Sequence, residues 1–267
     1  MVNKTKPIYF SKQDLIEKLK NISETGWIPN ARKRKKGGIG NTLEDLLGIK
    51  ENNLPIPNAA EWELKAQRLN SSSLITLFHM DPSPRAIGFV SKILLPKYGW
   101  VHEKAGKKYS VFEKSFRQTI HVLTRSDRGF MVNIDSNEKK ILITFDSRSV
   151  DSRHLNWLQS VKEKIGLGEL DPQPYWGFDD LEYKAGTKLL NCFYVQAEVK
   201  KERGKEFYKY SKVTMFQKFN FNGFLKAIKE AKILIDFDAR TGHNHGTKFR
   251  MRQNNLSMLY EKTTEII

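Results

Sequence analysis

Among the places where a glutamate stands two residues before a lysine, three are candidates for chemistry: Glu63 with Lys65, Glu182 with Lys184, and Glu198 with Lys200. On a β-strand, two residues spaced in this way point to the same side of the sheet and lie roughly 6.6 Å apart. This arrangement suits phosphodiester hydrolysis, because a carboxylate can hold Mg²⁺ while the neighbouring ammonium stabilises developing charge. A second oxygen ligand must come from another element, since Mg²⁺ is usually held by more than one group.

Glu63 and Lys65 have the most suitable surroundings of the three pairs. Residues 61–68 alternate between apolar and polar side chains, which predicts a strand with one buried face. The pair at 198–200 runs into the sequence KKERGKE, which is typical of a solvated edge, and residues 179–184 lack a clear alternation. In a chain with 28% charged residues such spacings also arise by chance, so spacing alone leaves a solvated strand open.

A second segment with chemical potential covers residues 238–252 and is rich in arginine, histidine and glycine. Arginine can donate a bidentate pair of hydrogen bonds to guanine, and histidine can donate or accept at a base edge. The candidate base-reading side chains are Arg240, His243, His245, Lys248, Arg250 and Arg252. The alternative is an irregular surface loop that is merely rich in charge.

Two further groups of cations suit contacts with phosphate rather than with bases. The run ARKRKKGG at residues 31–38 predicts a loop, and its cations are Arg32, Lys33, Arg34, Lys35 and Lys36. Flexible cations of this kind gain affinity through counterion release without a fixed geometry. Arg68 lies at the end of the strand that carries Glu63, which also favours a phosphate contact.

The overall charge supports a polyanionic partner. The chain has 46 Lys and Arg against 30 Asp and Glu, a formal net charge of +16. The cations are spread along the whole sequence, which favours nucleic acid over a membrane surface. We expect no membrane-spanning segment and no signal peptide, and a single cysteine, Cys192, excludes an internal disulfide and a cysteine-based zinc site. These features predict a cytoplasmic protein.

The pattern of elements predicts a mixed α/β fold. Helices are expected at residues 11–24, 43–47, 151–165 and 222–232, and strands at 61–68, 73–79, 116–124, 129–135, 139–145, 188–200, 206–219 and 233–237. We expect 73–79 to be the partner strand of 61–68, and the next three strands to form a meander. A cluster of glycine and proline between 166 and 177 predicts two lobes, 1–170 and 171–267.

The segment from Gly38 to Arg68 resembles the MvaI/BcnI family of restriction endonucleases, which is related in its catalytic core to the mismatch-repair nuclease MutH. The matching positions are Gly38, Gly40, Thr42, Leu43, Glu44, Leu46–Ile49, Pro57, Glu63 and Lys65. The likeness continues through residues 72–79 and 236–252. It implies a PD-(D/E)xK nuclease core with a smaller recognition lobe, and catalytic roles for Glu44, Glu63 and Lys65.

The resemblance also implies a cofactor and partners. These are Mg²⁺, duplex DNA cut at a short CCNGG-like site, a monomeric enzyme, recognition residues in the C-terminal segment, and a cognate methyltransferase that protects the host site. Two rival functions stay open: a MutH-like nicking or repair endonuclease, and a sequence-specific DNA-binding protein with an inactive nuclease core.

One position departs from the family pattern. Where the motif carries an aspartate after the proline, this chain has Asn58, which can offer Mg²⁺ a neutral oxygen but no charge. Three explanations compete. Glu61, which shares strand parity with Glu63, supplies the missing carboxylate; Glu44 takes a larger share of metal binding; or Asn58 abolishes cleavage while DNA binding survives.

Overall fold

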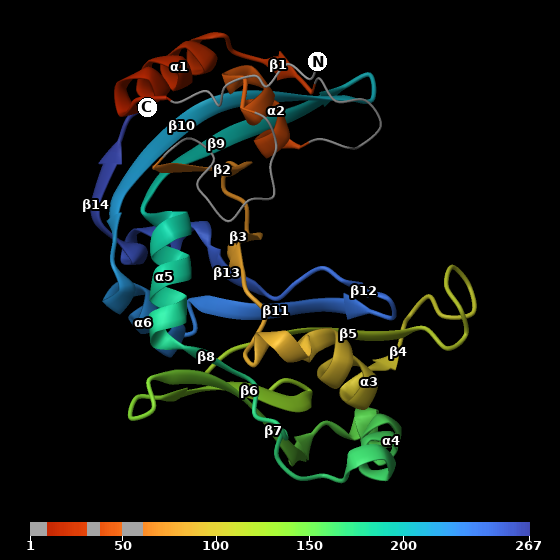
Figure 1. Cartoon of the computed structure of the whole chain (residues 1–267). Helices are drawn as coiled ribbons and strands as arrows, with labels where there is room; N and C mark the ends of the chain where they lie inside the picture. Colours follow the sequence, from red (N-terminus) through yellow and green to blue (C-terminus); the bar gives the residue numbers. More distant parts are fainter. Residues whose placement is uncertain (1–9, 31–37, 50–60) are drawn as a thin grey trace, which may run out of the picture. The chain divides into compact units, whose positions relative to one another are not determined.

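The computed structural model describes residues 10–30, 38–49 and 61–267. The chain folds into two units, each assembled from segments that are distant in the sequence (Figure 1). Unit 1 comprises the residues up to 73 together with 184–221 and 253–267, and unit 2 comprises 74–183 and 222–252. These units do not follow the expected division between residues 170 and 171, because in both of them strands from the second half of the chain pair with strands from the first half.

The sheet of unit 1 runs in the order β1 (Ile28–Pro29), β10 (Lys205–Phe219), β9 (Asn191–Glu202) and β2 (Trp62–Arg68), with β14 (Tyr260–Glu265) paired to β10. Strands β9 and β10 form the hairpin that the sequence predicts. Its turn has Arg203 and Gly204 at φ 48° and 78°, which is typical of a two-residue turn that matches the twist of the strands.

Strand β2 forms where the alternation predicts it, but its partner is different. We expected residues 73–79 to pair with it, whereas the structure pairs β2 with β9 in a parallel ladder. Glu63 lies opposite Cys192, and Lys65 lies opposite Tyr194. The alternation of β2 predicts the strand and its buried face, but it carries no information about a partner that is supplied much later in the chain.

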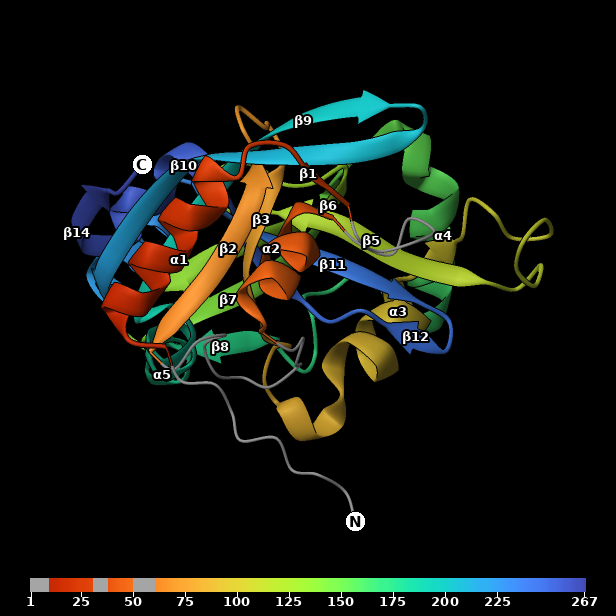
Figure 2. The same cartoon turned by 90° about the horizontal axis from the view of Figure 1, so that it is seen from above.

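Two helices cover one face of this sheet, as Figures 1 and 2 show. Helix α1 (Lys12–Glu24) begins after Ser11, whose hydroxyl accepts a hydrogen bond from the backbone N–H of Asp14. The Asp14 carboxylate accepts from the backbone N–H of Ser11 in return, which completes a capping box. The apolar face of α1 is buried, and its buried residues are Leu15, Leu19 and Ile22. The prediction for this helix is therefore confirmed.

Helix α2 (Ile39–Leu47) starts earlier than expected, because Gly38 precedes its first turn rather than Asn41 or Thr42. It ends as predicted at Gly48, whose φ of 72° is the left-handed conformation that glycine adopts readily. Both helices pack on the same core, which includes Leu43, Leu47, Trp62, Phe193, Val195, Tyr208 and Tyr210. The helices α1 and α2 therefore cover the face of β2 that carries Trp62. The side chains of Glu63 and Lys65 lie on the opposite face of the strand.

The larger sheet of unit 2 runs in the order β3 (Leu74–His79), β13 (Lys248–Arg252), β11 (Ile233–Arg240), β5 (Lys114–Ile120) and β4 (Trp100–Val101), with β12 (His243–Asn244) paired to β11. A smaller sheet contains β6 (Arg128–Asp135), β7 (Lys140–Val150) and β8 (Tyr175–Gly177). The expected meander is thus split between two sheets. Residues 248–252, where the sequence analysis expects no strand, form one because Phe249 and Met251 alternate into the core.

Aromatic side chains join the two sheets of unit 2. The Phe116 ring lies 5.4 Å from the Phe130 ring of the smaller sheet and 5.4 Å from the Phe237 ring of the larger one. Offset and edge-to-face ring pairs of this kind stabilise a core beyond the area that they bury. The larger sheet therefore has one face held against the core and an opposite face of polar side chains.

Short helices complete the described part of the chain. They are η1 (Arg85–Ile87), η2 (Val90–Leu94), α3 (Leu95–Tyr98), η3 (Ser152–His154), α4 (Leu155–Ile165), α5 (Phe178–Leu189), α6 (Phe221–Lys229) and η4 (Gln253–Leu259). Helices α4 and α6 were predicted, whereas α5 was not. Among the described residues, no helix has the length and apolar character needed to cross a membrane.

Candidate functional site

Glu63 and Lys65 lie together on β2, as their spacing predicts. The Nζ atom of Lys65 is 3.0 Å from Oε1 of Glu63, and the two side chains are 11% and 5% exposed. Trp62 points to the opposite face of the strand, where it packs in the core beneath α1 and α2. Burying an ionised carboxylate this deeply costs free energy unless it is paired with a positive charge. The fold therefore needs the ion pair with Lys65 to keep Glu63 ionised at this position.

A second lysine, which the sequence analysis did not single out, completes this cluster. Lys188, in the last turn of α5, places its Nζ 2.9 Å from Oε2 of Glu63, and its side chain is 19% exposed. Each oxygen of the carboxylate therefore has an ammonium within 3.0 Å. The sequence pattern predicts a strand that begins at Lys188, whereas the structure has this residue in a helix. Its neighbours give no signal that the helix ends beside Glu63.

Two other groups near Glu63, the Cys192 thiol and the Tyr260 hydroxyl, are neutral at physiological pH. Burial raises the pKa of the Cys192 thiol to about 12. Burial also raises the pKa of the Tyr260 hydroxyl well above its ordinary value, and the proximity of Cys192 and Glu63 raises it further. Neither group has the ionisation of a nucleophile or general base near neutrality. The chemistry available at this face of β2 is therefore that of Glu63 and its lysines.

A network of amide and hydroxyl groups anchors the far end of the same strand. The Tyr194 hydroxyl donates to Oε1 of Gln253 at 2.6 Å, and the Gln253 amide donates to the Ser71 carbonyl at 2.8 Å. The Gln67 amide donates to the Ser73 carbonyl at 2.8 Å. These bonds tie β2, β9 and η4 together. They hold the strand that carries the glutamate–lysine pair, and their residues gave no signal in the sequence.

The described residues supply only part of a magnesium site. Across residues 10–30, 38–49 and 61–267, no group of three His, Cys, Asp or Glu side chains is placed to hold a metal ion. Glu63 fits as one ligand, because a carboxylate is a hard oxygen donor. Glu61 is exposed directly before β2, Glu44 is half-buried on α2, and Asn58 lies outside the described residues.

The predicted recognition segment forms a polar face on the larger sheet of unit 2. Lys248 pairs with Asp238 at 3.1 Å, and Arg250 pairs with Asp236 at 3.0 Å. Arg117 of β5 reaches the other oxygen of Asp238 at 2.8 Å. Burial alone would raise the pKa of Asp238, but the hydrogen bond and charge of Lys248 and the charge of Arg117 lower it. The sequence predicted the cations but not the aspartates that orient them.

Arg240 differs from the other predicted base-reading residues. Its Nη1 atom lies 3.0 Å from Oε1 of Glu113, which is buried, and its guanidinium stands 4.7 Å from the centre of the Tyr109 ring. The side chain therefore contacts the loop between β4 and β5 and is held there by two interactions. Arg252, at the end of β13, is exposed.

The two histidines lie at the tip of a turn that an aspartate holds in place. The His243 and His245 rings meet edge to face, with 4.1 Å between their centres. Asp81 accepts hydrogen bonds from the Thr247 backbone N–H at 2.8 Å and from the Asn244 amide at 3.0 Å. The turn is thus fixed to the strand that precedes Asp81, a residue that no sequence signal identified.

The remaining predicted residues are placed as follows. Arg68 is exposed at the end of β2 and pairs with Glu206 at 3.1 Å. The basic run from Arg32 to Lys36 lies outside the described residues. The other two glutamate–lysine pairs do not form buried clusters. Glu198 and Lys200 make separate ion pairs with Lys209 and Glu202, and residues 182–184 belong to helix α5.

Comparisons with known proteins show which family and which solved structures the chain is similar to. The model of the MvaI/BcnI restriction endonuclease family matches residues 16–260. The solved complex of restriction endonuclease MvaI with cognate DNA is 25% identical, covers 97% of this chain and 100% of its own, and gives a TM-score of 0.76. The structure of MvaI in the absence of DNA is 24% identical with the same coverage and a TM-score of 0.54. No curated protein sequence matches the chain.

These likenesses confirm the predicted fold class. The chain has a mixed α/β architecture with several sheets and helices, and it matches a nuclease of the PD-(D/E)xK type. The sequence resemblance behind this prediction covers residues 38–68, 72–79 and 236–252, whereas the family model matches residues 16–260.

Proposed function

Because the chain belongs to the MvaI/BcnI restriction endonuclease family, we propose that it is a type II restriction endonuclease that hydrolyses duplex DNA at a short CCNGG-like site. The proposal includes Mg²⁺ as cofactor, action as a monomer, a cytoplasmic location, and a cognate methyltransferase that protects the host's own sites. The observation that supports it is the buried ion pair of Glu63 and Lys65, the two residues that match the glutamate and lysine of the nuclease motif in the sequence.

The metal part of the proposal rests on the donor chemistry of Glu63. Its carboxylate would ligate Mg²⁺, and Asn58, Glu61 and Glu44 are the candidates for the further oxygen ligands. When bound, Mg²⁺ polarises the phosphate and activates water. A neutral amide at position 58 would leave more of the ionic attraction to Glu63 and to whichever of the two other glutamates joins it.

The two lysines have different proposed roles. Lys65 would turn from Glu63 toward the scissile phosphate, where its ammonium stabilises the charge that develops on a non-bridging oxygen. Lys188 would stay on Oε2 of Glu63 and keep the carboxylate from rotating, since it approaches from a different element, α5. Lys188 is therefore a positioning residue, and the network around Gln253 holds the strand on which both partners depend.

The polar face of unit 2 supports recognition of bases. Asp236 and Asp238 hold Arg250 and Lys248 in fixed directions on the sheet, so less rotational freedom is lost when a donor meets a guanine. We assign His243, His245 and Arg252 to the same surface. Arg68 and the basic run 32–36 are the proposed phosphate contacts.

Asn58 also favours a second candidate function. If no glutamate replaces the missing charge, the chain is a sequence-specific DNA-binding protein with an inactive nuclease core. A MutH-like enzyme would share the core but nick one strand.

Incubating a sequenced viral DNA with the protein in Mg²⁺ and mapping the ends separates these functions. Discrete double-strand products support a restriction endonuclease, nicks alone support the MutH-like enzyme, and specific binding without cleavage supports the inactive core.

Replacing Lys65 tests the catalytic assignment directly. Lys65→Ala should abolish cleavage while leaving specific binding in Ca²⁺ within a few-fold, because the lysine acts on the transition state. Lys200→Ala is the matched control, because the ion pair of Lys200 is with the exposed Glu202. This variant should cut DNA at the parental rate. A Lys65→Ala enzyme that retains a tenth of the rate or more would contradict the assignment.

A further inference from the structure

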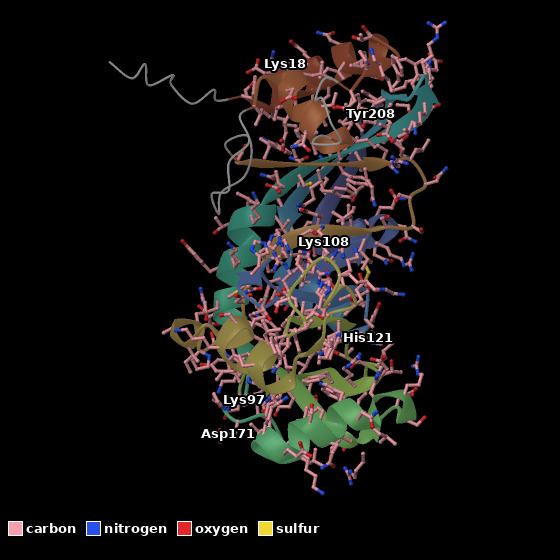
Figure 3. All side chains as sticks on the ribbon, turned by 90° about the vertical axis from the view of Figure 1, so that its right-hand side faces the viewer. Lys18, Lys97, Lys108, His121, Asp171 and Tyr208 are labelled. Atoms are coloured by element: carbon pink, nitrogen blue, oxygen red, sulfur yellow. The ribbon has the colours of Figure 1, made fainter. Side chains whose placement is uncertain are left out.

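The loop between β4 and β5 exposes large apolar side chains that the core does not explain. We call residues 101–113 the arm. It projects beyond the ends of its two strands (Figure 1), and within it Val101 is 72%, Val111 is 63% and Phe112 is 84% exposed. The same loop carries three exposed cations, Lys104, Lys107 and Lys108. The arm points toward the viewer in Figure 3, where Lys108 is labelled.

Hydrogen bonds at its neck hold the arm in one shape. The backbone N–H of His102 donates to the Glu113 carbonyl at 2.8 Å, and the His102 Nδ1 accepts from the Lys104 N–H at 3.0 Å. The His102 ring packs edge-on against Tyr109 at 4.9 Å, and His102 and Glu113 are themselves buried. The exposed apolar side chains are therefore presented on an ordered loop, which reduces the entropy lost when they bind a partner.

Arg240 attaches the arm to the recognition segment. Its guanidinium pairs with Glu113 and lies over the Tyr109 ring, so one side chain of β11 contacts both the neck and the middle of the arm. The backbone of Thr241 donates to the Lys114 carbonyl, and the Thr241 hydroxyl accepts from the Lys114 N–H at 2.9 Å. The arm and the turn that carries His243 consequently leave the same end of the sheet of unit 2.

We propose that the arm docks onto duplex DNA beside the bases read by the recognition segment. Lys104, Lys107 and Lys108 would contact phosphates, while Phe112 and Val111 enter the groove against base edges. Charge selects this partner, since Glu103 is the one exposed carboxylate among residues 101–113, against three exposed lysines. Apolar side chains flanked by cations match a groove, which offers thymine methyl groups and base edges between two phosphate rows.

This inference rests on the proposed function, and it adds a contact that the nuclease motif and the recognition segment do not include. The arm would give Arg240 a positioning role in place of the base contact predicted from the sequence. It would also extend the protected stretch of DNA beyond the short recognised site, because the arm projects past the end of the sheet.

The test compares Phe112→Ser with Tyr183→Ser. Tyr183 is an aromatic residue of α5, also in unit 2, and is 78% exposed, which makes it a matched control. Affinity is measured in Ca²⁺ for two duplexes of equal length, one with a central CCNGG site and one without it. Phe112→Ser should weaken binding by about tenfold or more, since a phenylalanine loses its burial, and Tyr183→Ser should stay within about twofold of the parent.

A second variant tests the cations. Replacing Lys104, Lys107 and Lys108 together by glutamine should make the slope of log affinity against log salt shallower by roughly 0.9 for each lost phosphate contact. Parental affinity and slope in both variants would overturn the proposal. So would loss of a concentration-dependent dimer in Phe112→Ser with unchanged DNA binding, because the partner would then be a second copy. If the parent binds neither duplex, the proposed function itself fails.

Discussion

The ion pair between Lys188 and Glu63 gives a prediction whose magnitude follows from the structure. At 2.9 Å and an effective dielectric constant near 20, the gross attraction between the two charges is about 6 kcal/mol. Burial of both groups offsets part of this gain. Lys188→Met keeps the length and packing of the side chain, and it leaves Glu63 with Lys65 at 3.0 Å. We therefore expect a loss of about 2–3 kcal/mol in unfolding free energy, less than the ~3–5 kcal/mol of a buried charge left alone.

A double-mutant cycle isolates the interaction from other effects of each substitution. Unfolding in urea is measured by circular dichroism for the parent, Lys188→Met, Glu63→Gln and the double variant. Once the carboxylate charge is gone, the ammonium of Lys188 has lost this partner, so adding Lys188→Met to Glu63→Gln should cost under about 1 kcal/mol or even stabilise. The coupling energy should then be about 1–3 kcal/mol.

Lys226→Met serves as the control for removing a lysine. Lys226 is 70% exposed and lies 3.9 Å from Glu230, so this variant should change stability by less than about 0.5 kcal/mol. Purely additive losses from Lys188→Met and Glu63→Gln would refute the reasoning. They would mean that Lys188 does not stabilise the charge on Glu63 and has no positioning role through it.

Three further predictions concern the metal, the basic run and acid stability. Asn58→Asp should raise the Mg²⁺-dependent cleavage rate, because an anionic ligand replaces a neutral one; an unchanged or lower rate assigns the ligand to Glu61 or Glu44. Deleting residues 32–36 should make the salt dependence of DNA affinity shallower, by about 0.9 in slope per phosphate contact, at an unchanged site; a new site preference would show that this run reads bases. Because the folded-state pKa of Asp238 is lowered, its stabilising contribution is complete above its unfolded pKa and disappears as pH falls through the folded value. Asp238→Asn should therefore lose less stability on acidification than the parent, and coincident curves would contradict this.

Local rules predicted the elements that depend on neighbouring residues. The capping box at Ser11 and Asp14, the alternation around Glu63, and the charged hairpin at 201–205 are each specified within a few positions, and all three form. The pairing of β2 was missed because two strands with one buried face each are equally acceptable partners in the sequence. The buried residues of β9, distant in sequence, decide the pairing once α1 and α2 cover the shared face.

The same limit explains the outcome at the candidate sites. A period of two places Glu63 and Lys65 on one side of a strand, but the second ammonium on Glu63 comes from α5, where Lys188 looks like any surface cation. Arg240 shows the converse. Composition groups it with Arg250, although Arg250 pairs with an aspartate on the polar face of the sheet and Arg240 pairs with the buried Glu113 at the neck of the arm. Residue type states what a side chain can donate, and only its partner determines whether that donor is directed toward DNA or toward the protein itself.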